Sequence, residues 1–141
     1  MASIQKYYSK ELVSLPPDAS VVDAGRLMGA RTVGSVVVME GGRPAGIVTE
    51  RDLVAQVVVP AKPPERTTLA EVMVREVPSV EPAETAEACS ALMAKTGARY
   101  LFVRQADAVI GIVSLKDVIR ALLEERESEV RQLTAYVTGG R

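Results

Sequence analysis

The chain has 141 residues, of which 48% are apolar and 25% charged, and its formal net charge is −1. This length is that of about one domain, and the balanced charge argues against a general nucleic-acid surface, which needs a clustered basic excess. With no histidine and a single cysteine, Cys89, the chain excludes an intrachain disulfide and catalysis by a Ser-His or Cys-His pair.

The same inventory makes a transition-metal site unexpected. No apolar run reaches the length that spans a membrane, and the first residues do not read as a signal peptide. One unpaired cysteine suits a reducing compartment, so the expected location is the cytoplasm, with no membrane partner.

The first half of the chain alternates short strand and helix signals. Two prolines break a first strand, and Asp18 or Ser20 is placed to cap the helix that follows. A Val-rich run predicts a strand buried on both faces. The predicted elements are an N-terminal segment at 1–11, a strand at 12–15, a helix within 17–30, strands at 34–39 and 45–48, and a helix from 49 to about 57.

The second half repeats this order after a proline-containing linker. Glu84 or Thr85 is placed to begin its first long helix, and Gly97 to end it. The predicted elements are a short helix near 69–74, a strand at 77–80, a helix to about 96, strands at 100–104 and 108–113, and a helix from 114 that runs past the repeat.

The two halves are an internal duplication. Residues 4–57 align with 69–122 without a gap, and ten of the 54 aligned pairs are identical, where chance gives roughly three or four. Each half is near the lower size limit for independent folding, so one core shared by both halves is expected. The predicted divisions are 4–58, a linker at 59–68, 69–123, and a helical extension with a frayed tail at 124–141.

A strand–helix junction recurs in both halves and is the candidate for chemistry. It reads Thr49-x-x-Asp52 in one half and Ser114-x-x-Asp117 in the other. Each fits a helix capping box, in which the hydroxyl and the carboxylate satisfy backbone N–H groups. Each also fits an anion site, because a helix N-terminus offers free N–H groups and a positive dipole end. The neighbouring Arg51 or Lys116 adds a cation, and both interpretations stay open.

Residues 4–122 resemble a tandem pair of cystathionine-β-synthase (CBS) domains, often called a Bateman module. The resemblance rests on the doubled Gly-hydrophobic-Val-[Thr/Ser]-x-x-Asp junction, on helices at 17–30 and 82–95 led by Pro-x-x-[Ser/Thr], and on the Val-rich middle strands. It implies an α/β fold of the α+β type, with two β-α-β-β-α units packed through their sheets about a pseudo-twofold axis.

The resemblance also implies two ligand clefts, each of which combines residues of both halves. One cleft would take Thr49, Arg51, Asp52, Val77, Pro78, Arg99, Tyr100 and Leu101. The other would take Leu12, Val13, Gly34, Ser35, Val36, Ser114, Lys116 and Asp117. Strand backbone would face the adenine, the hydroxyl, amides and cation would hold phosphate, and the aspartate would accept from the ribose hydroxyls.

The implied function is that of a non-enzymatic adenine-nucleotide sensor, with AMP favoured over ADP, ATP or an S-adenosyl compound. Because Arg51 and Arg99 both serve the cleft of Asp52, that cleft is expected to bind more tightly. A homodimer and an unknown client protein are the expected macromolecular partners.

Two alternatives stay open beside the sensor. One is a structural or interaction module whose Thr/Ser-x-x-Asp junctions only cap helices. The other is a small nucleotide hydrolase, which would need a general base and usually a metal. Asp52 and Asp117 are expected in different clefts, and no carboxylate cluster accompanies either. Among other residues, Cys89 is expected to be a small buried core residue, and Tyr7 and Tyr8 to serve packing or a dimer contact.

Overall fold

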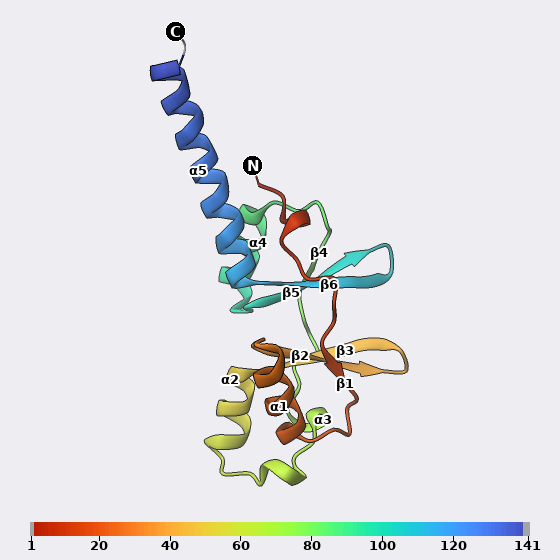
Figure 1. The fold of residues 1–141 in the computed structure, drawn as a ribbon. Helices are drawn as coiled ribbons and strands as arrows, with labels where there is room; N and C mark the ends of the chain where they lie inside the picture. The colour runs from red at the N-terminus through yellow and green to blue at the C-terminus, as the bar shows by residue number, and fades with distance from the viewer. Residues whose placement is uncertain (1, 140–141) are drawn as a thin grey trace. The chain divides into compact units, whose positions relative to one another are not determined.

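Figure 1 shows the computed structural model of the chain, which describes residues 2–139. The strands are β1 (Ser14–Leu15), β2 (Ser35–Glu40), β3 (Arg43–Thr49), β4 (Ser79–Val80), β5 (Tyr100–Gln105) and β6 (Ala108–Ser114). The helices are α1 (Val21–Arg31), α2 (Glu50–Leu53), α3 (Leu69–Val72), α4 (Ala86–Thr96) and α5 (Leu115–Gly139), with a π-helix η2 (Val54–Val58) and 3-10 helices η1 (Ile4–Lys6) and η3 (Pro64–Arg66).

The described residues contain two three-stranded sheets of the same topology. In the first, β1 runs parallel to β2 and β2 antiparallel to β3; in the second, β4, β5 and β6 repeat this order. The registers correspond residue for residue, since Ser35 pairs with Thr49 and Tyr100 with Ser114. In both sheets the helices cover one face (Figure 1). The mixed α/β fold expected from the sequence is confirmed.

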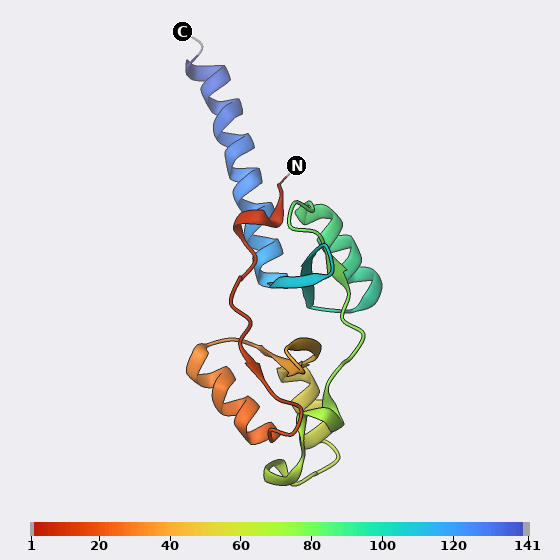
Figure 2. The same cartoon turned by 90° about the vertical axis from the view of Figure 1, so that its right-hand side faces the viewer.

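The compact units of the fold are not the two sequence repeats. One unit contains 12–77, and the other contains 1–11 together with 78–141. The N-terminal segment of each repeat therefore belongs to the other repeat's unit. Ser9 bridges Ile112 on β6, and its equivalent Val74 bridges Ile47 on β3. In Figure 2 the N-terminal turn, drawn in red, lies beside α5.

Two glycines make room for these added segments. A Cβ on Gly46 would lie 2.3 Å from the Val74 carbonyl oxygen, and one on Gly111 would lie 2.5 Å from that of Ser9. Real Cβ atoms do not approach so closely, so only glycine lets the incoming backbone reach the strand. Gly46 and Gly111 are among the identical pairs of the duplication, and this contact gives that identity a physical reason.

Each unit has its own buried cluster, where the sequence predicted one core shared by two halves. The cluster of the 12–77 unit is Val21, Ala24, Met28, Val36, Val38, Val48, Val57, Leu69 and Val72. The cluster of the other unit is Ile4, Ala86, Cys89, Met93, Leu101, Val103, Val113, Val118 and Ala121. The N-terminal segments that each repeat contributes to the other repeat's unit are called the exchanged segments. Ile4 and Leu69, one from each of them, are both 0% exposed.

The helix ends follow local sequence signals. Ser20 and Asp23 form a capping box at the start of α1, and Thr85 accepts from the Ala88 N–H at the start of α4. Gly97 ends α4 in the left-handed conformation, as predicted, and Thr32 ends α1 in the same way.

The predicted helix from residue 49 to about 57 is confirmed in extent, since the chain is helical from Glu50 to Val58, but its second half is not α-helical. After Leu53 it widens into the π-helix η2, where the Val59 N–H donates to the Val54 carbonyl, five residues earlier, at 2.9 Å. Three of the five η2 residues are valines, whose branched Cβ crowds the preceding turn of an α-helix.

The predicted final helix is confirmed as α5, which continues past the repeat to Gly139. Fraying was predicted for 138–141, of which 140–141 lie outside the described residues. Cys89 is 0% exposed, as expected for a small core residue. Tyr7 and Tyr8 are half-buried and pack against the cluster that contains Cys89.

Candidate functional site

The Thr49 junction is built where β3 ends and α2 begins. The Asp52 N–H donates to Thr49 Oγ1 at 3.2 Å, and the Thr49 N–H donates to Asp52 Oδ2 at 2.8 Å. The Thr49 hydroxyl also donates to Asp52 Oδ2, at 2.9 Å. A complete capping box therefore occupies the hydroxyl and one carboxylate oxygen of this junction.

The Ser114 junction repeats this geometry where β6 meets α5. The Ser114 N–H donates to Asp117 Oδ2 at 2.9 Å, and the Asp117 N–H donates to Ser114 Oγ at 3.1 Å. The capping interpretation of both motifs is thus realised in the structure. In each box the aspartate accepts through Oδ2 and leaves Oδ1 outside the box. The two junctions differ in which charged groups lie near that Oδ1.

The surrounding sheet end adds backbone groups to each junction. The Glu50 N–H donates to the Gly34 carbonyl at 3.1 Å, and the Leu115 N–H donates to that of Arg99, the equivalent residue, at 2.8 Å. Of the first-turn N–H groups, those of Arg51 and Lys116 have no recorded acceptor among residues 2–139. Each junction therefore presents an uncommitted N–H beside a basic side chain, which is the donor set of an anion site.

The remaining predicted residues gather at the same end of their own sheet, because the starts of the first two strands adjoin the end of the third. In the 12–77 unit, the Val13 carbonyl accepts from the Val37 N–H at 2.8 Å, and Ser35 pairs with Thr49. In the other unit, the Pro78 carbonyl accepts from the Phe102 N–H at 2.9 Å, and Tyr100 pairs with Ser114. Leu12 and Val77 lie just before these strand starts, within the 12–77 unit.

Some predicted residues can contribute only their backbone. The side chains of Val36 and Leu101 are 0% exposed and belong to the core clusters of their units. Their predicted role was to present strand backbone to an adenine, and that role stays a prediction. The assignment of residues from both halves to one ligand stays a prediction.

The two aspartates have different electrostatic surroundings. Arg120 Nη1 lies 3.6 Å from Asp117 Oδ1, and the Arg120 guanidinium lies 5.5 Å from the centre of the Tyr7 ring. Tyr7 donates its hydroxyl hydrogen to Glu124 Oε2, and this bond raises the pKa of the Tyr7 phenol. At Asp52, no cation is recorded within ion-pair distance among the described residues.

Sequence reasoning missed this group around Asp117. The Asp117–Arg120 spacing of three is a helix pair that could have been read from the sequence. The contact of Tyr7 with Glu124 joins residues 117 apart, and no local pattern announces it. In the first half Ala55 stands where Arg120 stands in the second, so Asp52 has no such neighbour.

Residues 2–139 contain neither a metal-ligand cluster nor a membrane-spanning helix. That part of the chain holds no group of three or more His, Cys, Asp or Glu side chains placed for a metal ion. Its helices are either too short or too polar to cross a lipid bilayer.

Comparison with known proteins gives one consistent result. A family model described as "CBS domain" matches residues 4–59 and again 69–124. The mitochondrial CBS domain-containing protein CBSX3 of Arabidopsis thaliana is 33% identical over 128 residues, which are 87% of this chain. The chain spans 62% of the length of that relative, and 61% of an uncharacterized Methanopyrus kandleri protein.

Solved structures agree with this match. A putative signal-transduction protein with CBS domains from Burkholderia ambifaria is 31% identical, with a TM-score of 0.81 over 86% of this chain and 91% of its own. A hexameric CBS-CP12 protein from bloom-forming cyanobacteria is 26% identical, with a TM-score of 0.77 over 97% of this chain and 86% of its own.

Proposed function

The chain belongs to the CBS-domain family as a tandem pair, and on that premise we propose that it is a regulatory module that binds an adenine nucleotide without catalysis. The family resemblance drawn from the doubled junction is confirmed by the two matched ranges. AMP is the ligand we favour.

The observation that carries the proposal is the free donor and acceptor set at the Thr49 junction. The Asp52 carboxylate keeps one oxygen outside its capping box, with no cation recorded beside it among the described residues. The Arg51 side chain is exposed at the same helix start. A carboxylate oxygen suits ribose hydroxyl donors, and a cation with an uncommitted N–H suits phosphate.

The two junctions should bind with unequal affinity. At the Ser114 junction, Arg120 already occupies the outer oxygen of Asp117, so a ribose hydroxyl must displace that ion pair. The pair is partly exposed, so breaking it costs only a small amount of free energy. At Asp52 a ribose hydroxyl has no ion pair to break, so even this small cost is absent. This contrast supports the prediction that the tighter site is the one containing Asp52.

Exposed cations favour a phosphorylated ligand over an S-adenosyl compound. Arg51, Arg99 and Lys116 are exposed and lie at the sheet ends where the junctions form. The positive charge of a sulfonium ligand would repel these cationic side chains, whereas a phosphate would attract them. ADP and ATP carry phosphate as AMP does and would also satisfy these cations.

Ligand binding would regulate by population shift. A nucleotide can move the module between two arrangements only by its difference in affinity for them. The hexameric relative supports self-association of this chain, and a homodimer stays our expectation. The client protein would read the arrangement that the nucleotide favours.

A second candidate is an interaction module in which the junctions only cap helices. The complete capping boxes at Thr49 and Ser114 favour it, because they give both motifs a structural reason without any ligand. In that case the client binds regardless of nucleotide.

Ligand-induced thermal stabilisation separates the two candidates. A ligand at 100 times its Kd adds about 2.7 kcal/mol to the free energy of unfolding. We expect a raised Tm with AMP, and a smaller or no rise with S-adenosylmethionine. A Tm that stays flat across AMP, ADP, ATP and S-adenosylmethionine would favour the interaction module. Phosphate release from ATP with Mg²⁺ would instead show the hydrolase that the sequence argues against.

A further inference from the structure

The outer part of α5 presents an apolar stripe that no other described residue covers. Leu123, Val130, Leu133 and Val137 are each more than half exposed. Leu123, Val130 and Val137 are seven residues apart, and Leu133 lies between the last two. From Glu129 to Thr138 every side chain is exposed. This spacing is that of two heptads of a coiled coil, whose apolar residues line the contact surface, or seam, with a partner helix.

A helix in this situation needs a partner. Residues 125–139 extend for about 22 Å at 1.5 Å per residue. Isolated helices of this length are marginal in water, and most helical stability comes from packing of an apolar face. The stripe is therefore better explained as a buried surface of an assembly than as a face left in water.

The stripe also contains a preformed socket. A hollow of about 390 Å³ lies on α5, lined by Leu123, Arg126, Glu127, Val130 and Arg131. The first four of these stand at positions i, i+3, i+4 and i+7, which is the set of four residues that receives one side chain of a facing helix. The hollow thus has the geometry that a second helix fills.

We propose that α5 of a second copy of this chain packs antiparallel along this stripe. In the register that brings the stripes together, Leu123 lies level with Leu133 of the second copy, and Arg126 with Val130 of the second copy. Val130 of the second copy then enters the hollow, and by symmetry each helix fills the hollow of the other.

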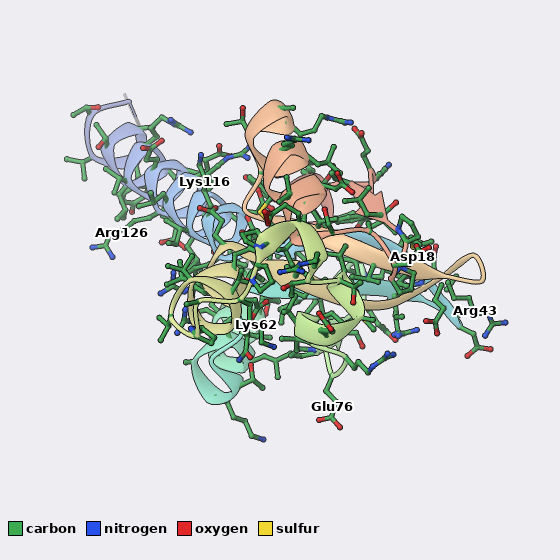
Figure 3. The ribbon with its side chains drawn as sticks, turned by 90° about the horizontal axis from the view of Figure 1, so that it is seen from below. Asp18, Arg43, Lys62, Glu76, Lys116 and Arg126 are labelled. Atoms are coloured by element: carbon green, nitrogen blue, oxygen red, sulfur yellow. The ribbon has the colours of Figure 1, made fainter. Side chains whose placement is uncertain are left out.

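Charge selects the antiparallel direction. A parallel, in-register pair would set Arg126 opposite Arg126 in the middle of an apolar seam. The antiparallel register instead brings the Arg126 guanidinium near Glu127 and Glu129 of the second copy. Figure 3 shows the Arg126 side chain projecting outward from α5, free to make such a contact. A single polar or charged residue in a seam is an established way to set register and oligomer state, and charges beside the seam set orientation.

This seam specifies the surface behind the self-association expected above, and it does not depend on nucleotide binding. Failure of the seam would leave the thermal response to AMP unchanged. Failure of nucleotide binding would equally leave the seam intact.

Cross-linking of the full chain tests the direction. The native Cys89 is fully buried, so an introduced thiol is the accessible one. Leu123→Cys chains mixed with Leu133→Cys chains should cross-link to one another through a short bismaleimide, and each variant alone should react at least tenfold more slowly. Adding Arg126→Leu to the Leu123→Cys chain should remove the directional preference and allow that chain to cross-link to itself.

Sedimentation equilibrium tests the seam itself. Leu133→Asp should raise the dissociation constant of self-association at least tenfold. Gln132→Asp, at the preceding residue and outside the stripe, should leave it within twofold. Circular dichroism of both variants checks that α5 stays helical. A wild-type chain that stays monomeric, equal effects of the two variants, or self-cross-linking of Leu123→Cys alone as fast as the mixture would overturn the proposal.

Discussion

Thr32 holds a backbone conformation that suits glycine. It ends α1 at φ 53° and ψ 49°, while the equivalent residue at the end of α4 is Gly97, at φ 75°. A Cβ in the left-handed region costs roughly 1–2 kcal/mol. Glycine removes that cost, but it also raises the conformational entropy of the unfolded chain, which offsets part of the gain.

Thr32→Gly should therefore raise the free energy of unfolding by about 0.5–1 kcal/mol in urea titration. Gly97→Thr, its reciprocal, should lower it by about 1–2 kcal/mol, although nothing lies within 4 Å of a Cβ there to cause a clash. If Thr32→Gly destabilised the protein as a glycine does in ordinary backbone, the strain assigned to Thr32 would be absent.

Cys89 should report on folding through its thiol. Burial, with a smaller contribution from the Glu84 charge, raises the pKa of Cys89 to about 11 from an ordinary value of 9. The folded protein then keeps its proton over a pH range in which the unfolded chain has lost it. Stability should therefore fall as pH rises from about 9 to about 11, because the unfolded state binds fewer protons there.

The measurement is the Tm difference between wild type and Cys89→Ala across that pH range, since other groups titrate in both. Ala24 occupies the equivalent position in the first repeat, so the substitution is conservative. Above pH 9 the Tm of the wild type should fall relative to that of Cys89→Ala. At pH 8 native Cys89 should react slowly with thiol reagents. A constant difference with rapid labelling would show an accessible thiol.

Among elements, the exchanged N-terminal segments depend on two glycines. A methyl group on Gly46 would meet the Val74 carbonyl, which accepts a hydrogen bond from the Ile47 N–H at 2.9 Å. Relieving the clash must break that bond or shift the strand, so Gly46→Ala should cost about 2 kcal/mol or more of unfolding free energy. Gly111→Ala, which meets Ser9 and the Tyr8 ring, should cost a similar amount.

Gly25→Ala is the matched control, because it makes the same change inside α1 with nothing within 4 Å. Helix propensity predicts that it gains up to about 1 kcal/mol. Equal effects of Gly46→Ala and Gly25→Ala on the urea midpoint would contradict the close approach.

The elements show which parts of the fold a sequence can reveal. Caps at Ser20, Thr85 and Gly97 are local signals and were predicted from neighbouring residues. The exchange of Ile4 and Leu69 between units was not, because an apolar residue at the start of a repeat carries no sign of which core it will join. Duplication makes both cores similar, and only long-range pairing decides between them.

The candidate site shows the same division. The Thr49 and Ser114 capping boxes follow from spacing alone, and both formed. The contrast between Asp52 and Asp117 was expected from Arg99 and Gly34, yet the structure adds a different cause, the ion pair of Arg120 with Asp117. That cause depends on a side chain one helical turn away, supported by the distant Tyr7 ring.

For the whole molecule, the central claim is that one duplicated junction binds nucleotide more tightly than the other. Substitution of Asp52 also removes a capping box, so loss of a cap must be separated from loss of a ligand contact. Asp23 supplies that control, because it completes the capping box of α1 with Ser20 and takes no part in either junction.

Isothermal titration of AMP into Asp52→Ala, Asp117→Ala and Asp23→Ala is the most direct test. We expect Asp52→Ala to weaken the tighter site at least tenfold, Asp117→Ala to leave that site unchanged, and Asp23→Ala to lower the Tm without changing Kd. Abolition of AMP binding by Asp117→Ala alone, or wild-type affinity in Asp52→Ala, would contradict the account.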